Sequence, residues 1–364
     1  MRKNIAIIVF LLTAIVCNAS STLPVSGEWV KPSDTNIQYV GRFNFTNPDR
    51  PAFNFPGVEI RAAFSGTSLK MMARPMSGYF MVQIDGHEAF KVGFNAERDS
   101  VVSLATALTS GRHTVRLAYC MEGLNRHPEF WGFILDKGCG LISPDPLPNR
   151  KIEFIGNSIT CAYGIESTDR NDHFEDETEN HYYGFATIVS ERLGAIHTSI
   201  SRSGIGIYRN YNGPTEGSPD PMPWQYWYTL FNDHSQEWDF SRYTPDVVCI
   251  NLGTNDFSTA GYDATRYEAA YEQFLSRLRT VYPTQKIVLL SGPMLGEKEN
   301  EIVKDILNRI TKKRQKSGDS NIYRFDFTPA DGSLGYGADW HPSLLQHQHM
   351  ADELTPFLKT IMGW

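Results

Sequence analysis

The sequence predicts two domains in series: an antiparallel β-sandwich over residues 25–145 and a doubly wound α/β domain with a parallel sheet over residues 150–364. Three observations support this division. The first part alternates apolar and polar residues with period two, a proline-rich connector follows, and the second part alternates apolar runs with amphipathic stripes. A chain of 364 residues is also longer than one hydrophobic core usually serves.

The predicted strands of the first domain are short and bounded by turn residues. Val58–Phe64 places apolar side chains at every second position, and Tyr79–Ile84 runs directly into Asp85-Gly86, a strong hairpin signal. Val115–Tyr119 repeats the alternation. No stretch in this part has the 3.6-residue period of a helix, so the pattern favours a β-sandwich.

The second domain begins beyond Ser143–Arg150, where three prolines predict a stiff, extended connector. Near-continuous apolar runs then indicate strands buried on both faces, and the stripes between them have the period of helices. The predicted strands are residues 152–155, 196–200, 247–252, 287–290 and 322–327. The predicted helices are residues 267–282, 302–310 and 344–362.

The N-terminus has the pattern of a cleaved signal peptide over residues 1–19. Arg2 and Lys3 precede the apolar stretch Ile5–Val16, and small residues follow from Ala19. The stretch is too short to span a bilayer, which needs about 20 apolar residues. We therefore expect an exported protein, periplasmic or secreted. A lipid anchor on Cys17 is the less favoured alternative, because a valine stands where a lipoprotein signal has a small residue.

Composition excludes several classes of protein. The net charge of −7 argues against nucleic acid as a partner, and the dense cationic run Lys312–Lys316 ends a predicted helix, where it complements the helix dipole. No further segment is apolar enough to span a membrane. The sequence leaves the oligomeric state open.

Four cysteines remain after cleavage at Ala19, and their spacing is too open for a zinc site. They are Cys120, Cys139, Cys161 and Cys249. Four separate thiols are the favoured interpretation, and a Cys120–Cys139 disulfide in an oxidising compartment is the alternative. No metal and no cofactor is predicted.

Unusual polar residues follow the predicted strands of the second domain. Because ligands bind at the carboxyl ends of the strands in such sheets, these segments should gather at one edge. The segments are Gly156-Asn-Ser-Ile-Thr-Cys-Ala-Tyr-Gly164, Ser201-Arg-Ser-Gly-Ile-Gly206, Gly253-Thr-Asn-Asp256 and Gly337-Ala-Asp-Trp-His-Pro-Ser343. Each alone could be a simple turn or helix start, but their order at one edge points to a site.

These blocks resemble the SGNH (GDSL-like) hydrolase superfamily over about residues 150–364. The preceding β-sandwich, together with Ser-Ile-Thr-Cys-Ala-Tyr-Gly and Asp-Trp-His-Pro-Ser, resembles carbohydrate esterase family two. That resemblance implies a jelly-roll fold for the first domain and an acetylxylan esterase activity, the removal of acetyl groups from xylan and related glycans.

The resemblance assigns roles to particular residues. Ser158 would be the nucleophile and His341 its base, because a serine hydroxyl is weak until a base takes its proton. The oxyanion of the tetrahedral intermediate would meet the backbone N–H groups of Ser158 and Gly204 and the side-chain amide of Asn255.

Two positions depart from the superfamily pattern. Asn157 precedes the nucleophile where an aspartate is common, and Ala338 stands three residues before His341, where the orienting aspartate is usual. We expect Asp339 to orient the imidazole instead, since residues two apart in an extended segment project to the same side. A backbone carbonyl near Trp340 is the alternative, which would leave a Ser–His dyad.

Aromatic residues suggest where sugar binds. Trp340 adjoins His341, and Trp224 begins an aromatic cluster with Tyr226–Tyr228, so the two tryptophans are predicted to bind substrate. Packing in the core or in loops is the competing interpretation for the cluster. The predicted function is therefore an exported serine esterase acting on acetylated polysaccharide. An esterase or lipase acting on a non-carbohydrate ester and an inactive glycan-binding protein are the alternatives.

Overall fold

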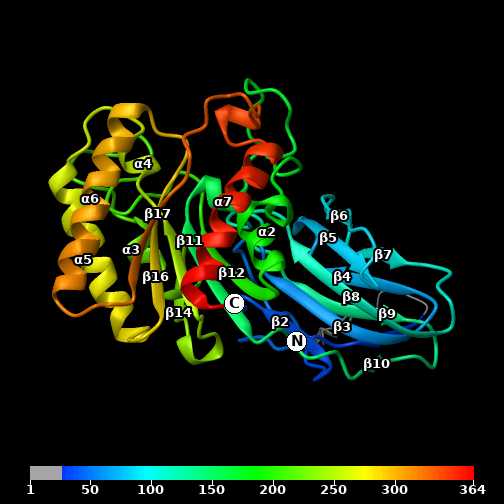
Figure 1. Ribbon diagram of the computed structural model, residues 1–364. Helices are drawn as coiled ribbons and strands as arrows, with labels where there is room; N and C mark the ends of the chain where they lie inside the picture. The colour runs from blue at the N-terminus through cyan, green and yellow to red at the C-terminus, as the bar shows by residue number, and fades with distance from the viewer. Residues whose placement is uncertain (1–26) are drawn as a thin grey trace, which may run out of the picture.

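The protein, a computed structural model, is described over residues 27–364 and consists of a β-sandwich beside an α/β domain (Figure 1). The signal peptide expected over residues 1–19 and the alternative at Cys17 lie outside the described residues. No helix within residues 27–364 has the length and apolar character needed to cross a membrane.

Two antiparallel sheets form the sandwich, as the period-two alternation predicts. One sheet has the order β1 (Glu28–Val30), β9 (Phe130–Leu135), β4 (Leu69–Ala73) and β7 (Val101–Ala105). The other has the order β10 (Leu141–Ile142), β3 (Glu59–Gly66), β8 (Gly111–Tyr119), β5 (Gly78–Ile84) and β6 (Phe90–Phe94), with β2 (Ile37–Val40) also paired to β3.

The hairpin signal at Asp85-Gly86 is confirmed. Strands β5 and β6 pair antiparallel across this turn, and both turn residues have positive φ, 52° at Asp85 and 73° at Gly86. Two consecutive left-handed residues match the right-handed twist of a hairpin. The N–H of His87 closes the turn on the carbonyl of Ile84 at 2.9 Å.

The second domain has the predicted five-stranded parallel sheet. Its order is β12 (Ala195–Ser201), β11 (Arg150–Gly156), β15 (Val247–Asn251), β16 (Lys286–Ser291) and β17 (Ile322–Asp326). The helices that flank it are α2 (Phe185–Arg192), α5 (Ala264–Val281), α6 (Glu297–Lys316) and α7 (Leu344–Met362). Short helices lie in its loops: α1 (Ser158–Cys161), α3 (Met222–Gln225), α4 (Thr254–Phe257) and the 3-10 turns 181–183, 240–242 and 338–340.

Both faces of this sheet are covered, as the apolar runs predict. Val247 and Cys249 of β15 pack in the cluster that includes α2 and α7, whereas Val248 and Ile250 pack in the cluster that includes α5 and α6. Because successive side chains of a strand point to opposite faces, the two helix pairs lie on opposite sides of the sheet (Figure 1).

The two domains share one hydrophobic core. Phe53 and Phe80 of the sandwich belong to the same buried cluster as Ile200 and Tyr271 of the α/β domain. A hairpin of β13 (Tyr228–Leu230) and β14 (Asp233–Glu237) lies between β12 and β15 in the chain.

The four cysteines, Cys120, Cys139, Cys161 and Cys249, are all free thiols, so the alternative Cys120–Cys139 disulfide does not form.

Candidate active site

Strand β11, which pairs with β12 and β15, delivers Ser158 to the carboxyl edge of the sheet. Ser158 is the first residue of α1, and Asn157 caps that helix by accepting a hydrogen bond from the Ile159 N–H at 3.1 Å. A side chain at Gly156 would stand 2.0 Å from Thr160 Oγ1, so the sharp turn from strand to helix requires glycine there. Asn157 therefore supplies a neutral cap where the superfamily commonly has a carboxylate.

His341 approaches Ser158 from the loop before α7. Its Nε2 lies 2.9 Å from Ser158 Oγ, while its Nδ1 faces the backbone carbonyls of Ala338 at 3.1 Å and Asp339 at 3.2 Å. The Tyr163 ring stacks on the imidazole with centroids 4.1 Å apart. Burial lowers the pKa of His341 to about 4, so the ring is neutral near pH 7. Nδ1 then donates to the carbonyls and Nε2 is left to accept the serine proton.

The expected role of Asp339 as the orienting carboxylate is wrong. Its carboxylate accepts hydrogen bonds from the Tyr163 hydroxyl at 2.6 Å and the Phe174 N–H at 3.2 Å, and lies 3.0 Å from His173 Nδ1. Only its backbone carbonyl meets His341. The site therefore has the geometry of a Ser–His dyad whose base is oriented by main-chain carbonyls.

Backbone conformation explains this error. The prediction assumed an extended segment, but Asp339 and Trp340 are both left-handed, with φ of 48° and 63°. The turn directs the Asp339 side chain away from the ring of His341. It also brings the Ala338 carbonyl to Nδ1 of that ring, so the residue in the superfamily's aspartate position contributes its main-chain oxygen instead of a carboxylate. The Ala338 N–H donates to the carbonyl of Gly164 at 3.1 Å, which ties this turn to the nucleophile segment.

The segments after β12 and β15 are joined to one another. Gly204 has a φ of +77°, and the Asn255 side-chain amide donates to the carbonyl of Ile205 at 2.8 Å. The buried Asp256 carboxylate accepts hydrogen bonds from the backbone N–H groups of Ile207–Arg209 at 2.9–3.0 Å. Burial raises the pKa of Asp256 to about 6. The two predicted donors, Gly204 and Asn255, thus come from one interlocked loop pair.

Three contributors to the site were missed in the sequence. Tyr163 and Gly164 lie within the quoted nucleophile block, and a side chain at Gly164 would meet Ala338 Cβ at 2.4 Å. A glycine directly after an aromatic was the available signal for them. Glu122 comes from the sandwich and hydrogen-bonds Ser203, the neighbour of Gly204. No local pattern marks such a contact between domains.

The two tryptophans predicted to bind sugar are both exposed, Trp340 by 52% and Trp224 by 51% of their surfaces. Trp340 adjoins His341, and the Arg170 guanidinium lies 4.5 Å from its ring centroid. Tyr226 and Trp227, by contrast, are buried in the shared core. The packing interpretation therefore holds for those two members of the cluster.

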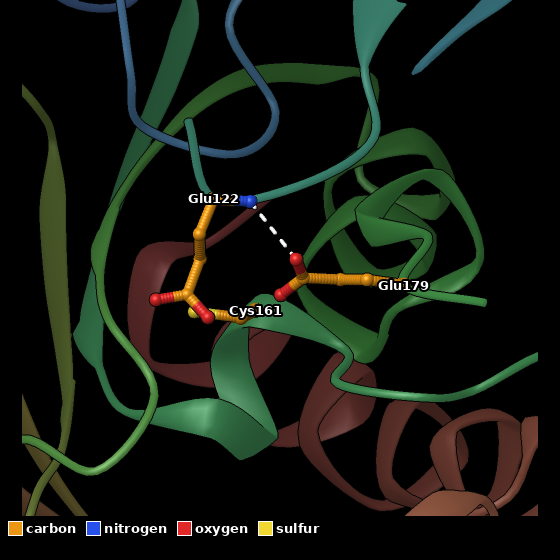
Figure 2. Close-up of side chains that lie close together, drawn as sticks. All are labelled: Glu122, Cys161 and Glu179. Atoms are coloured by element: carbon orange, nitrogen blue, oxygen red, sulfur yellow. Dashed lines mark hydrogen bonds between the residues drawn. The ribbon is translucent and has the colours of Figure 1, made fainter. Parts of the chain in front are cut away.

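Among residues 27–364, one group places metal-ligand atom types close together: Glu122, Cys161 and Glu179, whose ligand atoms lie within 4.8 Å of one another (Figure 2). Burial, and after it the charge of Glu122, raises the pKa of the Cys161 thiol, which opposes the thiolate that a metal needs. Both Glu122 carboxylate oxygens already accept hydrogen bonds from Ser203. The donor set therefore fits a metal poorly.

A serine hydroxyl beside a neutral histidine, at the carboxyl edge of a parallel sheet, is the arrangement of a serine hydrolase. Residues 39–145 match the family Carbohydrate esterase 2 N-terminal, and residues 152–354 match the family GDSL-like Lipase/Acylhydrolase. The chain therefore belongs to the GDSL-like lipase/acylhydrolases and, through its first domain, to the family 2 carbohydrate esterases, which are carboxylic ester hydrolases.

Similar proteins and solved structures are esterases of the same kind. The cellulase/esterase CelE of Acetivibrio thermocellus is 38% identical over 337 residues, which are 92% of this chain but 40% of that protein. An acetylxylan esterase / glucomannan deacetylase of Cellvibrio japonicus is 29% identical over 355 residues, 96% of this chain and 95% of that one. A family two carbohydrate esterase from Clostridium thermocellum, solved in complex with cellohexaose, has a TM-score of 0.83 and 37% identity, covering 90% of this chain and 99% of that chain.

Proposed function

We propose that the protein is an exported serine esterase that removes acetyl groups from acetylated polysaccharide such as xylan. The observation that carries the proposal is the 2.9 Å contact between Ser158 Oγ and the Nε2 of a neutral, carbonyl-oriented His341. The relatives supply the substrate class, since one is named an acetylxylan esterase / glucomannan deacetylase and a related structure holds cellohexaose.

The acylation step follows from this geometry. His341 Nε2 takes the proton of Ser158 as Oγ attacks the acetyl carbonyl carbon, and the carbonyl oxygen becomes an oxyanion. The backbone N–H groups of Ser158 and Gly204 and the second N–H of the Asn255 amide are its proposed donors. The C–O bond to the sugar then breaks, and the imidazolium returns its proton to the leaving sugar oxygen.

Deacylation repeats the same steps with water. His341 takes a proton from a water molecule, the resulting hydroxide attacks the acetyl-Ser158 ester, and acetic acid, which ionises to acetate in water, leaves as Ser158 Oγ takes the proton back from the imidazolium. During both steps the positive charge on His341 faces the carbonyl dipoles of Ala338 and Asp339 instead of a carboxylate. Two carbonyls fix the tautomer of the ring, which is the part of the orienting role that the dyad retains.

Trp340 is the proposed sugar platform, because a half-exposed indole directly beside the base can stack on the pyranose ring that carries the acetyl group. Trp224 is proposed as a second sugar-binding residue because its side chain is half exposed. Substituting each tryptophan by alanine should show how much each contributes to substrate binding. We expect Trp340→Ala to raise KM for acetylated xylan more than Trp224→Ala does.

The test of this function is acetate release from acetylated xylan by the wild type and by Ser158→Ala. We expect release by the wild type only, unaffected by a chelator, with acetyl esters preferred over octanoyl esters. A clear preference for octanoyl esters would instead indicate a lipase. Glycan binding without acetate release by the wild type would indicate a glycan-binding protein.

A further inference from the structure

Two carboxyl groups face one another at the junction of the domains, next to the nucleophile helix. Glu122 lies in the loop after β8, Glu179 lies before the 3-10 turn 181–183, and Cys161 ends α1 (Figure 2). The Glu122 N–H donates to Glu179 Oε2 at 2.9 Å. Glu179 is fully buried, and its Oε1 has no hydrogen-bond partner among the residues that the structure describes.

The Glu122 carboxylate reaches across to the oxyanion loop. Its Oε1 accepts the Ser203 N–H at 2.6 Å, and its Oε2 accepts the Ser203 hydroxyl. Ser203 directly precedes Gly204, whose carbonyl accepts the N–H of Tyr211 at 2.7 Å. The Gly204 N–H belongs to the peptide unit between Ser203 and Gly204. Glu122 of the sandwich domain binds Ser203 through two atoms, its N–H and its hydroxyl, and so holds that peptide unit in place. A bidentate contact of this kind fixes direction as well as distance.

The electrostatics of the pair require a proton. Arg202, the cation whose charge reaches Glu122, is itself paired with Asp220 at 3.5 Å. Neither Glu122 nor Glu179 forms an ion pair within residues 27–364. Burial, and then the nearby Glu122 charge, raise the pKa of Glu179 well above its ordinary value. Like charges this close cannot both ionise, and the oxygen without a partner, Glu179 Oε1, is where the proton fits.

We propose that Glu122 is a positioning residue of the oxyanion hole: as a carboxylate it clamps Ser203 and so aims the Gly204 N–H, and neutral Glu179 keeps it in place. The proposal rests on the proposed role of Gly204 in acetyl transfer. It gives the sandwich domain a part in the chemistry, because the first domain then supplies one of the supports of the transition state.

The first test compares Glu122→Ala and Glu122→Gln for acetate release. Loss of a whole oxyanion donor costs about 10²–10³ in kcat, so a misaimed donor in Glu122→Ala should cost about 10–100-fold, with KM little changed. Glu122→Gln keeps an acceptor for the Ser203 N–H and should lose only about threefold. Glu175→Gln, at an exposed carboxylate of the segment that leads to Glu179, is the control. Wild-type kcat in Glu122→Ala would overturn the proposal.

A double-mutant cycle with Ser203→Ala asks whether Glu122 acts through Ser203. Ser203→Ala removes one arm of the clamp and should lower kcat by a few fold. If the clamp is one unit, the double variant Glu122→Ala/Ser203→Ala should be no slower than Glu122→Ala alone. If the losses of kcat in the two single variants multiply in the double variant, the two residues act independently, and Glu122 does not act through Ser203.

Glu179→Gln tests the protonation state directly. A carboxamide is close in shape to a protonated carboxyl group, accepting from the Glu122 N–H and donating toward the Glu122 carboxylate. We expect kcat within about twofold of the wild type at neutral pH, and a folded protein by thermal melting. A tenfold loss of kcat in folded Glu179→Gln would mean that Glu179 acts as an anion, which contradicts the proposal.

Ser158→Ala separates this proposal from the function on which it rests. If Ser158→Ala keeps its activity, the esterase mechanism itself is wrong. If Ser158→Ala is inactive while folded Glu122→Ala turns over at the wild-type rate, the mechanism stands and only the positioning role is wrong. Should Glu122→Ala fail to fold, Glu122→Gln and the Ser203→Ala comparison carry the test, and a wild-type kcat in folded Ser203→Ala would count against the clamp.

Discussion

The two segments that carry the proposed nucleophile and base, 156–164 and 337–343, are held in contrasting ways. The nucleophile segment is built on regular structure: a buried strand runs into a short helix that Asn157 caps at its start and a left-handed Ala162 ends. The base segment is a turn with two consecutive left-handed residues, Asp339 and Trp340. A left-handed residue other than glycine costs about 1–2 kcal/mol, so this turn persists only because its surroundings fix it.

Asp339 is one of the residues that fix this turn. Its carboxylate bonds Tyr163 and Phe174, and its own N–H donates to the carbonyl of Asp172 at 2.9 Å. In a triad the aspartate carboxylate would hydrogen-bond the imidazole and stabilise its positive charge. Here the same residue type braces the loop, and main-chain oxygens hold the ring of His341. A carboxylate near a base in the sequence therefore need not contact that base in the fold.

The largest expected effects fall on the residues that the two segments bring together. Ser158→Ala and His341→Ala should each lower kcat for acetate release by about 10⁶, as knockouts of serine triads do elsewhere. Thermal melting would establish that the fold is intact. Either variant keeping more than a tenth of wild-type activity would mean that the pair is not the catalytic unit.

Asn255→Ala probes the third segment that meets this edge of the sheet. Loss of one oxyanion donor should cost about 10²–10³ in kcat and leave KM nearly unchanged. Because the Asn255 amide also donates to the carbonyl of Ile205, thermal melting should accompany the kinetics. A rise in KM at constant kcat would make Asn255 a substrate-binding residue instead.

The pH dependence of kcat/KM reports how the base segment tunes His341. Burial lowers the pKa of His341 to about 4, so activity should be lost only as pH falls through about 4. An ordinary histidine with a pKa of about 6.5 would be only about 3% neutral at pH 5, a difference of about 30-fold. An acid limb near pH 6.5 would contradict the buried, carbonyl-oriented ring.

Asp339→Asn should have the smallest effect on activity, because the carboxylate of Asp339 braces the loop and does not contact the imidazole. Asparagine tolerates the left-handed conformation and can still accept from Tyr163, so kcat should fall less than about threefold, with some loss of thermal stability. Tyr163→Phe is the matched variant, because it removes the hydrogen bond to Asp339 but keeps the stack on His341. A fall approaching 10⁴ in Asp339→Asn would restore the triad.

The regular elements could be predicted from the sequence, whereas the left-handed turn and the contact between the domains could not. Period-two alternation identified the β-sandwich and doubly buried apolar runs identified the parallel sheet, because burial imposes those patterns directly. The position of Ser158 followed from a strand running into a turn. The turn at Asp339 could not be predicted, since non-glycine left-handed residues have no reliable local signal. The contact of Glu122 with Ser203 could not be predicted either, because it depends on how the two domains pack against one another.

The roles of Ser158 and His341 can be tested by labelling with a small alkyl phosphonofluoridate, which reacts with a serine that has both a base and an oxyanion hole. After digestion, mass spectrometry should find one adduct, on the peptide that contains Ser158, and acetate release should fall in proportion to labelling. His341→Ala should label far more slowly. An adduct on another serine, or full acetate release from protein labelled at Ser158, would contradict the assignment of Ser158 and His341.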